Sequence, residues 1–167
     1  MSAEALPAGL RVGQGFDIHP VSSDASRPLV LGGVTIPGAP GLVGHSDADV
    51  VAHALADAVL GACGLGDLGR HFPDSDPRWA DADSMALLRE VMAIVGSHRR
   101  VLNADCSILC ERPPLAPHLS AMEDSLGNAV GAPVSVKAKR GEGLGPIGRA
   151  EGIACLAVVL VAAVSPS

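Results

Sequence analysis

Three polar stretches stand out in a largely apolar chain, and two of them carry side chains that bind metal ions in proteins. In GFDIH, Asp17 and His19 lie two residues apart just after an expected strand, so their side chains project to the same side. In HSDADVVAH, His53 lies on an expected helix, four residues from Asp49 and four from Asp57. A carboxylate beside a metal-bound histidine can fix the tautomer of its ring. Asp17, His19 and His53 together therefore predict a metal centre.

Two imidazoles and one carboxylate leave the fourth position of a tetrahedral zinc ion open, which distinguishes a catalytic zinc from a structural one. A substrate oxygen could fill that position. Taken alone, Asp17 could equally cap a turn and His53 could equally be a solvated helix residue, because single Asp and His residues are common on surfaces. The combination of three side chains, rather than any one of them, favours the metal centre.

The third stretch, VKAKRGEGLGPIGRAEG, is both glycine-rich and basic. Its basic residues are Lys137, Lys139, Arg140 and Arg149. Glycines let backbone N–H groups approach an anion closely and the basic side chains add charge, so the stretch suits a phosphate or a diphosphate. A plain solvated turn has the same composition, and the residues alone do not separate the two interpretations.

Composition limits the classes of protein that can hold these stretches. The 167 residues are 48% hydrophobic and 18% charged, which is typical of a globular domain with a packed core. We predict a single domain over residues 10–167, preceded by a flexible extension of residues 1–9. An aromatic content of 2% and a net charge of −6 argue against nucleic-acid binding, which normally needs stacking platforms and surplus Lys and Arg.

The two ends of the chain favour a soluble, cytoplasmic protein. MSAEALPAGL has no basic start and no long apolar run, unlike a secretory signal. The apolar stretch 153–164 is shorter than the roughly 20 residues that span a bilayer, so no membrane partner is expected. The four cysteines lie in apolar contexts without a CxxC pair, which favours buried thiols over disulfides or a thiolate zinc site. They are Cys63, Cys106, Cys110 and Cys155.

The elements that position these side chains follow from hydrophobic periodicity. Strands expected over 10–16 and 28–36 flank a polar turn at 22–26, which suggests a hairpin. A helix capped by Ser46 should end near Gly61 to Gly64, before an unusually long loop over 66–83. The remaining elements are helices over 84–98 and 117–130 and strands over 101–110, 134–139 and 152–164. This order favours an α+β fold, with helices packed on one face of a four-stranded mixed sheet.

The ordered stretches GFDIH, HSDADVVAH, LGDLGRHFPDSDP and VKAxxxEGLGxIGRAEGIA resemble the 2-C-methyl-D-erythritol 2,4-cyclodiphosphate synthase family, over about residues 11–164. The resemblance implies conversion of 4-diphosphocytidyl-2-C-methyl-D-erythritol 2-phosphate into the cyclic diphosphate with release of CMP. It also implies a homotrimer with each active site between two subunits. An apolar alternating set in the last strand, Ala154, Leu156, Val158 and Leu160, would likewise need a partner to cover it.

The resemblance also implies roles for individual residues. Asp17, His19 and His53 match zinc ligands, Glu142 matches the ligand of a second metal, Mg²⁺ or Mn²⁺, and His45 matches a phosphate-contacting residue of the catalytic site. The implied substrate-binding residues are Asp17, His19, His45, Ser46, Asp67, Leu68, Gly69, Phe72, Pro73, Asp74, Ser75 and Asp76. The implied nucleotide-binding residues are Cys110, Glu111, Arg112, Pro113, Pro114, Leu115, Ala116, Lys139, Arg140, Gly141 and Glu142. Pro146 and Arg149 match a cavity on the trimer axis that accepts isoprenoid diphosphates.

The implied reaction is in-line attack of the 2-phosphate oxygen on the β-phosphorus, so catalysis depends mostly on positioning and on charge neutralisation. Two departures affect the nucleotide pocket. Arg140 and Gly141 stand where the family usually has a threonine before Glu142, and Pro114 stands where it usually has a lysine. Arg140 could replace the lost hydroxyl donor and the lost charge, as a catalytic residue, or it could mark an altered choice of nucleotide.

Two rival functions remain open at this point. The first is a non-catalytic trimer that keeps the metal and the isoprenoid diphosphate cavity as a binding module, which the departures at Arg140 and Pro114 would motivate. The second is another metal-dependent phosphohydrolase that shares only local motifs.

Overall fold

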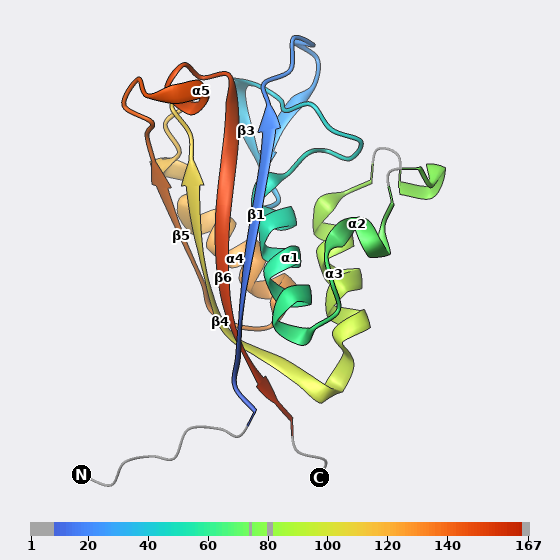
Figure 1. Ribbon diagram of the computed structural model, residues 1–167. Coiled ribbons are helices and arrows are strands. Elements are labelled where there is room, and N and C mark those ends of the chain that lie inside the picture. The colour runs from blue at the N-terminus through green and yellow to red at the C-terminus, as the bar shows by residue number, and fades with distance from the viewer. Residues whose placement is uncertain (1–8, 74, 80–81, 165–167) are drawn as a thin grey trace, which may run out of the picture.

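The computed structural model describes residues 9–73, 75–79 and 82–164, and its centre is a four-stranded sheet (Figure 1). The strands lie in the order β1 (Arg11–Pro20), β6 (Gly152–Ala163), β4 (Arg99–Leu109) and β5 (Val134–Lys139). Strand β6 is antiparallel to both of its neighbours, whereas β4 and β5 are parallel. The predicted four-stranded mixed sheet and α+β class are therefore confirmed.

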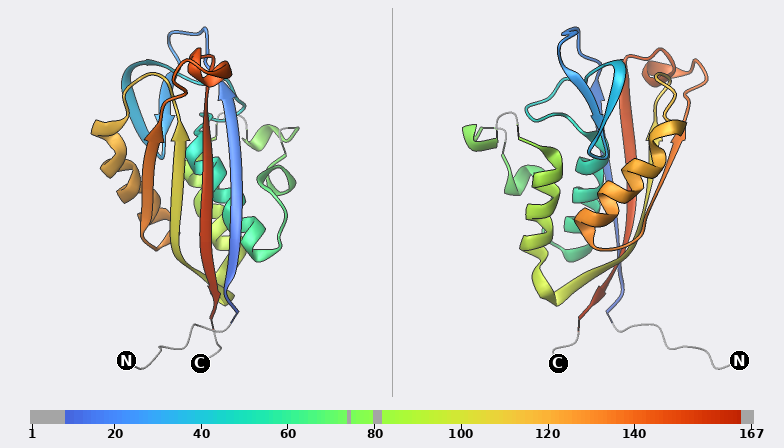
Figure 2. Two further views of the ribbon diagram at one scale, coloured as in Figure 1. Left: turned by 60° about the vertical axis from the view of Figure 1, so that its left-hand side comes forward. Right: turned by 180° about the vertical axis from the view of Figure 1, so that it is seen from behind.

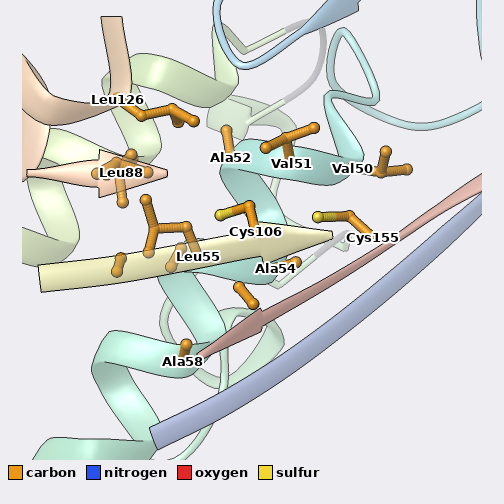
Figure 3. Close-up of a cluster of buried hydrophobic side chains, with 14 of the residues drawn as sticks. Val50, Val51, Ala52, Ala54, Leu55, Ala58, Leu88, Cys106, Leu126 and Cys155 are labelled. Carbon is orange, nitrogen blue, oxygen red and sulfur yellow. The ribbon is translucent and has the colours of Figure 1, made fainter. Parts of the chain in front are cut away.

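Three helices cover one face of this sheet, as Figures 1 and 2 show from several sides. They are α1 (Val50–Cys63), α3 (Ser84–Val95) and α4 (Leu119–Val130). Helices α1 and α4 contact the sheet directly, and α3 packs against these two helices. Leu55 of α1, Leu88 of α3 and Leu126 of α4 are fully buried in one apolar core (Figure 3). With so few aromatic residues, this core consists mainly of aliphatic side chains and buried thiols.

The predicted hairpin between the first two strands is wrong. Strand β1 pairs over its whole length with β6, near the other end of the chain. Strands β2 (Pro28–Leu31) and β3 (Val34–Pro40) instead pair with each other in a separate two-stranded sheet. Gly32 and Gly33 form the turn between them with φ values of 58° and 74°, a conformation that glycine adopts without strain. The segment expected to be one strand thus contains its own turn.

Helix α1 lies unusually close to β1 because small residues line both sides of their contact. A Cβ atom added at Gly13 would lie 1.9 Å from the Ala58 carbonyl oxygen, and one added at Gly15 would lie 2.0 Å from that of Ala54. Neither position can therefore hold a side chain while the helix keeps its place. This close approach brings His53 of α1 next to the end of β1.

The helix boundaries correct two expectations. Asp49, rather than Ser46, is the N-cap of α1 and accepts hydrogen bonds from the Val51 and Ala52 N–H groups. The loop expected over 66–83 contains the short helix α2 (Leu68–His71) and a 3₁₀ turn, η1 (Pro77–Trp79). Further short elements are η2 (Gly96–His98), η3 (Ala116–His118) and α5 (Gly145–Gly148).

The face of the sheet away from the helices is partly apolar. On β1 and β6 it exposes Val12, Phe16, Ile18, Leu156 and Val158, with 39% to 68% of each residue accessible. These five residues are called the outer apolar face below. Of the alternating set expected to need a partner, Leu156 and Val158 are exposed, whereas Ala154 is already buried. Within the described part of the chain, no helix has the length and apolarity needed to cross a membrane.

The cysteines have the environments expected of free thiols. Cys106, Cys110 and Cys155 are buried, and Cys63 is partly buried. All four are unpaired by disulfides.

Candidate metal centre and nucleotide pocket

Asp17, His19 and His53 lie close enough together to hold one ion. Asp17 Oδ2 is 3.1 Å from His19 Nε2 and 2.9 Å from His53 Nδ1. Among the residues that the structure describes, they are the one group of three or more potential ligands whose atoms gather in this way. Asp17 and His19 come from the end of β1, where both face the helices, and His53 comes from the first turn of α1.

The other polar atoms of the first two residues are held by the backbone. Asp17 Oδ1 accepts a hydrogen bond from the Ile18 N–H at 2.9 Å. His19 Nδ1 lies 2.7 Å from the Val43 carbonyl oxygen, and because a carbonyl can only accept, Nδ1 carries the proton and donates it. In the neutral ring this leaves the lone pair on His19 Nε2, facing Asp17 Oδ2.

The third ligand is oriented in the same way. His53 Nε2 lies 2.8 Å from Ser84 Oγ, whose hydroxyl donates to the Asp47 carboxylate. Because that hydroxyl has one hydrogen, its oxygen accepts from His53 Nε2–H and the ring's lone pair is on Nδ1, facing Asp17. Two imidazole lone pairs and a carboxylate oxygen thus point at one another, which is stable only with a cation or added protons between them.

The carboxyl pKa follows from this arrangement. Burial opposes ionisation of Asp17, but when the facing ring nitrogens of His19 and His53 carry the added protons, their hydrogen bonds to the carboxylate outweigh burial and hold its pKa far below the ordinary value. The hydrogen bond to Asp17 in turn raises the pKa of His19. Asp17 therefore stays an anion across the physiological pH range and is available as a ligand.

The expected carboxylate partners of His53 are elsewhere. Asp49 is fully buried and accepts hydrogen bonds from the Gly32 and Gly33 N–H groups at 2.8 and 2.7 Å, which ties the β2–β3 turn to α1. Asp57 accepts from the Leu68 N–H at 2.7 Å. The four-residue spacing was a poor guide because both carboxylates satisfy backbone donors of neighbouring segments.

The three candidate metal ligands line a cavity of about 290 Å³. Its lining residues are Asp17, His19, Gly44, His45, Ser46, His53, Leu68, Gly69, Phe72, Trp79 and Leu87. One wall is polar and includes the ligands, His45 and Ser46, and the other is formed by apolar side chains of α2, η1 and α3. The cavity is therefore suited to a compound with charged groups on one side and a carbon skeleton on the other.

A second cavity, of about 460 Å³, lies at the ends of β4 and β5. It is lined by Cys110, Glu111, Arg112, Pro113, Pro114, Leu115, Ala116, Ala138, Lys139 and Arg140. The Cys110 thiol donates to the Arg112 carbonyl at 3.0 Å, and burial raises the pKa of this thiol to about 11. Cys110 therefore orders the loop as a neutral thiol and is not a reactive thiolate.

The comparisons with known proteins bear on both cavities. A sequence model of the YgbB family matches residues 10–162. The chain belongs to the YgbB family. The 2-C-methyl-D-erythritol 2,4-cyclodiphosphate synthase of Geobacillus kaustophilus is 53% identical over 155 residues, which cover 90% of this chain and 97% of that protein. The synthase of the same name from Moorella thermoacetica is 53% identical, over 91% of this chain and 94% of that protein.

Solved structures of IspF and IspDF proteins have a fold similar to that of this chain. The Plasmodium falciparum IspF, in complex with CDP, has a TM-score of 0.81 at 30% identity, and the match covers 94% of this chain and 98% of that one. The bifunctional IspDF of Campylobacter jejuni has a TM-score of 0.88 at 38% identity. That match covers 93% of this chain but 43% of the longer IspDF chain.

In this chain of the YgbB family, seven of the twelve predicted substrate-binding residues line the first cavity. Asp67 instead caps α2 by accepting from the Arg70 N–H at 2.9 Å, and Asp76 pairs with Arg78 at 2.6 Å. Pro73 and Ser75 are exposed and outside the lining. Asp74 lies outside the described residues.

Nine of the eleven predicted nucleotide-binding residues line the second cavity, all except Gly141 and Glu142. Glu142 is exposed and has a positive φ of 51°. Arg140 Nη2 donates to Glu111 Oε1 at 2.9 Å across the cavity rim, so its guanidinium bridges the two loops that form the pocket. Pro146 and Arg149 are both exposed at α5, and Arg149 donates to Glu151 at 2.6 Å.

Several residues of this YgbB chain's site were missed by the sequence analysis. Trp79 and Leu87 contribute to the apolar wall, and Trp79 packs edge-on against Phe72 with ring centroids 4.9 Å apart. Arg27 donates to the carbonyls of Gly44 and Ser46 and so holds the backbone beside His45. A single apolar residue, or an arginine after a turn, gives no local signal of such a role.

Proposed function

We propose that this chain converts 4-diphosphocytidyl-2-C-methyl-D-erythritol 2-phosphate into 2-C-methyl-D-erythritol 2,4-cyclodiphosphate with release of CMP, in the cytoplasm, as a step in isoprenoid precursor synthesis. The observation that carries the proposal is the convergence of Asp17, His19 and His53 in a cavity with one polar and one apolar wall, in a chain of the YgbB family. The relatives at about half identity are named for this synthesis, and a structural neighbour is a complex with CDP.

Zinc is the metal that best fits the donor set at Asp17, His19 and His53. Two imidazole nitrogens and one carboxylate oxygen are typical of a catalytic zinc with an open position, whereas magnesium prefers oxygen ligands alone. When bound, zinc supplies a Lewis acid for a phosphate oxygen. The chain's own part is to keep Asp17 ionised and both ring lone pairs aimed inward, as the hydrogen bonds to the Val43 carbonyl and Ser84 favour.

Glu142 is the proposed ligand of a second metal, Mg²⁺ or Mn²⁺. A single exposed carboxylate suits such an ion, which commonly binds through one or two carboxylates together with substrate phosphates. The basic side chains of Lys139 and Arg140 lie next to it in sequence and would neutralise diphosphate charge.

The first cavity would hold the methylerythritol phosphate part of the substrate. His45 and Ser46 would contact the phosphates from the polar wall, while Leu68, Phe72 and Leu87 would exclude water from the carbon skeleton. The chemistry is in-line attack of the 2-phosphate oxygen on the β-phosphorus, in which the P–O bond to CMP breaks as the ring P–O bond forms. The chain therefore contributes mainly by positioning the reacting phosphate groups and by neutralising their charge.

The distance between the two cavities supports a shared active site in a homotrimer. Ile18, Ala154, Leu109 and Lys139 form one row across the sheet, so the metal centre and the nucleotide pocket lie at the same end. They are at opposite edges, because β1 and β5 are separated by three strand spacings of about 4.8 Å, or about 14 Å. A neighbouring chain could place its nucleotide pocket against this metal centre, with the outer apolar face buried between chains.

Pro146 and Arg149 would line a cavity on the axis of that trimer and bind isoprenoid diphosphates. The guanidinium of Arg149 already pairs with Glu151 of the same chain, so an anion would have to share or replace that partner.

A single-turnover assay on the cytidyl substrate tests the proposal, with CMP and the cyclic diphosphate measured with and without a chelator. A synthase gives both products in equal amounts and loses both with the chelator. A non-catalytic binding module gives no CMP. A phosphohydrolase gives hydrolysis products without the cyclic diphosphate, and either result would replace the proposed function.

A further inference from the structure

The ring of His53 is held on its far side by two residues that the metal centre itself does not include. Ser84 Oγ lies 2.8 Å from His53 Nε2, and the Ser84 hydroxyl donates to Asp47 Oδ1. We propose that Ser84 and Asp47 are positioning residues that fix the tautomer and the orientation of His53, so that its Nδ1 lone pair faces the metal. This inference rests on the metal centre of the proposed function.

The direction of the hydrogen bonds follows from the donors and acceptors present. The carboxylate of Asp47 only accepts, so the one hydrogen of the Ser84 hydroxyl is committed to it. The Ser84 oxygen is then an acceptor toward His53, which must carry its proton on Nε2. Asp47 thus acts on His53 through Ser84 and favours the Nε2–H tautomer, which leaves Nδ1 available to the metal.

Burial makes this arrangement rigid. Ser84 is 1% exposed, and its backbone N–H also donates to Asp47 Oδ2 at 3.3 Å, so the side chain and the start of α3 are fixed to the same carboxylate. Asp47 is anchored in turn by its own N–H, which donates to the Ala82 carbonyl at 3.2 Å. With solvent excluded, water cannot easily take the place of the serine hydroxyl.

Ser46 is a weaker candidate for the same role. Its Oγ lies 3.3 Å from His53 Nε2 and 3.3 Å from Ser84 Oγ, and it already accepts a hydrogen bond from the Ala48 N–H at 3.1 Å. Among the described residues, no carboxylate accepts a hydrogen bond from the Ser46 hydroxyl. The shorter contact and the buried acceptor behind it assign the positioning role to Ser84.

The test compares Ser84→Ala and Ser84→Thr with the parent chain. Removing the partner of a metal-bound histidine typically lowers metal affinity by 10- to 100-fold, so we expect Ser84→Ala to bind Co²⁺ that much more weakly, followed by visible absorption. We also expect ¹⁵N NMR of the metal-free protein, at a pH where His53 is neutral, to show a smaller share of the Nε2–H tautomer in Ser84→Ala than in the parent. Ser84→Thr keeps the hydroxyl and should restore both properties.

Ser125→Ala is the matched control, because it removes the hydroxyl of a half-buried serine on α4 rather than of one that touches His53. It should bind Co²⁺ like the parent. If Ser84→Ala keeps the parent's Co²⁺ affinity, or weakens it with the His53 tautomer unchanged, the positioning role is overturned and the proposed function stands. If the parent chain itself binds no metal, both the inference and the proposed metal centre fail.

Discussion

At the scale of single residues, the candidate metal centre is a convergence of three side chains whose remaining polar atoms are all hydrogen-bonded. Asp17 is held by a backbone N–H, His19 by a carbonyl, and His53 by Ser84. The sequence predicted the three candidate ligands through residue types, spacing and family resemblance. It could not predict Ser84, because nothing local connects that serine with a histidine 31 positions earlier.

Replacing a ligand should remove the metal. We expect His53→Ala to lose most of its bound zinc and most of its activity, because the two remaining ligands form an incomplete site. Elemental analysis of the purified variant measures the zinc directly. His98→Ala is the control, since His98 is exposed and lies outside the cluster, and it should keep the zinc content of the parent. Equal zinc in His53→Ala and the parent would show that the ligands are assigned wrongly.

Substitution of Arg140 tests its proposed catalytic role in the nucleotide pocket. If its guanidinium moves from Glu111 to the diphosphate, it acts mainly in the transition state, and we predict that Arg140→Ala lowers kcat by on the order of 100-fold. Steady-state kinetics on the cytidyl substrate separate kcat from KM. An unchanged kcat would limit Arg140 to bridging the two loops. A gain of activity in Arg140→Thr would show that arginine is a compromise at this position.

At the scale of elements, the contact between β1 and α1 places His53 beside Asp17. Local patterns located most helices and strands within a few residues, because hydrophobic periodicity and helix caps depend only on residues close together in the sequence. They failed for the pairing of β1, since its partner β6 begins more than 130 positions later and the polar turn at 22–26 suggested a nearer one. Pairing between distant segments depends on the packing of the whole core, which no local pattern contains.

Enlarging Gly15 should disturb the metal centre from a distance. Its added Cβ would overlap the Ala54 carbonyl oxygen, so we expect Gly15→Ala to lower the free energy of unfolding by about 1 to 3 kcal/mol and to weaken metal binding. Denaturant unfolding and Co²⁺ titration measure the two effects. Gly61→Ala is the matched control on α1, where the nearest atom would be 4.0 Å away. Unaltered stability and metal affinity in Gly15→Ala would contradict the close packing.

Asp49 joins the β2–β3 turn to the start of α1. Its two oxygens accept from the Gly32 and Gly33 N–H groups as well as from the first turn of the helix. Asp49→Asn would place an amide donor against backbone donors, so we expect a loss of about 2 to 3 kcal/mol in the free energy of unfolding. Denaturant unfolding at fixed protein concentration measures it. A loss below about 0.5 kcal/mol would mean that the turn and helix are held by other contacts.

At the scale of the whole molecule, the proposed shared active site requires a trimer, because each chain carries its two cavities at opposite edges of the sheet. Light scattering should give a mass near 50 kDa, three times the 16.8 kDa of one chain. Val158→Lys places a charge in the outer apolar face, and we expect it to yield monomers that release no CMP. A parent chain that is monomeric at micromolar concentration and still active would contradict the shared site.

The most direct test of the central claim is CMP release by chelator-treated protein before and after zinc is restored, with Mg²⁺ present throughout. We predict that the treated protein releases almost no CMP from the cytidyl substrate, and that added zinc restores both CMP and the cyclic diphosphate. His53→Ala, treated in parallel, should not recover. Full CMP release from protein shown by elemental analysis to lack zinc, or none from the zinc-loaded trimer, would contradict the account.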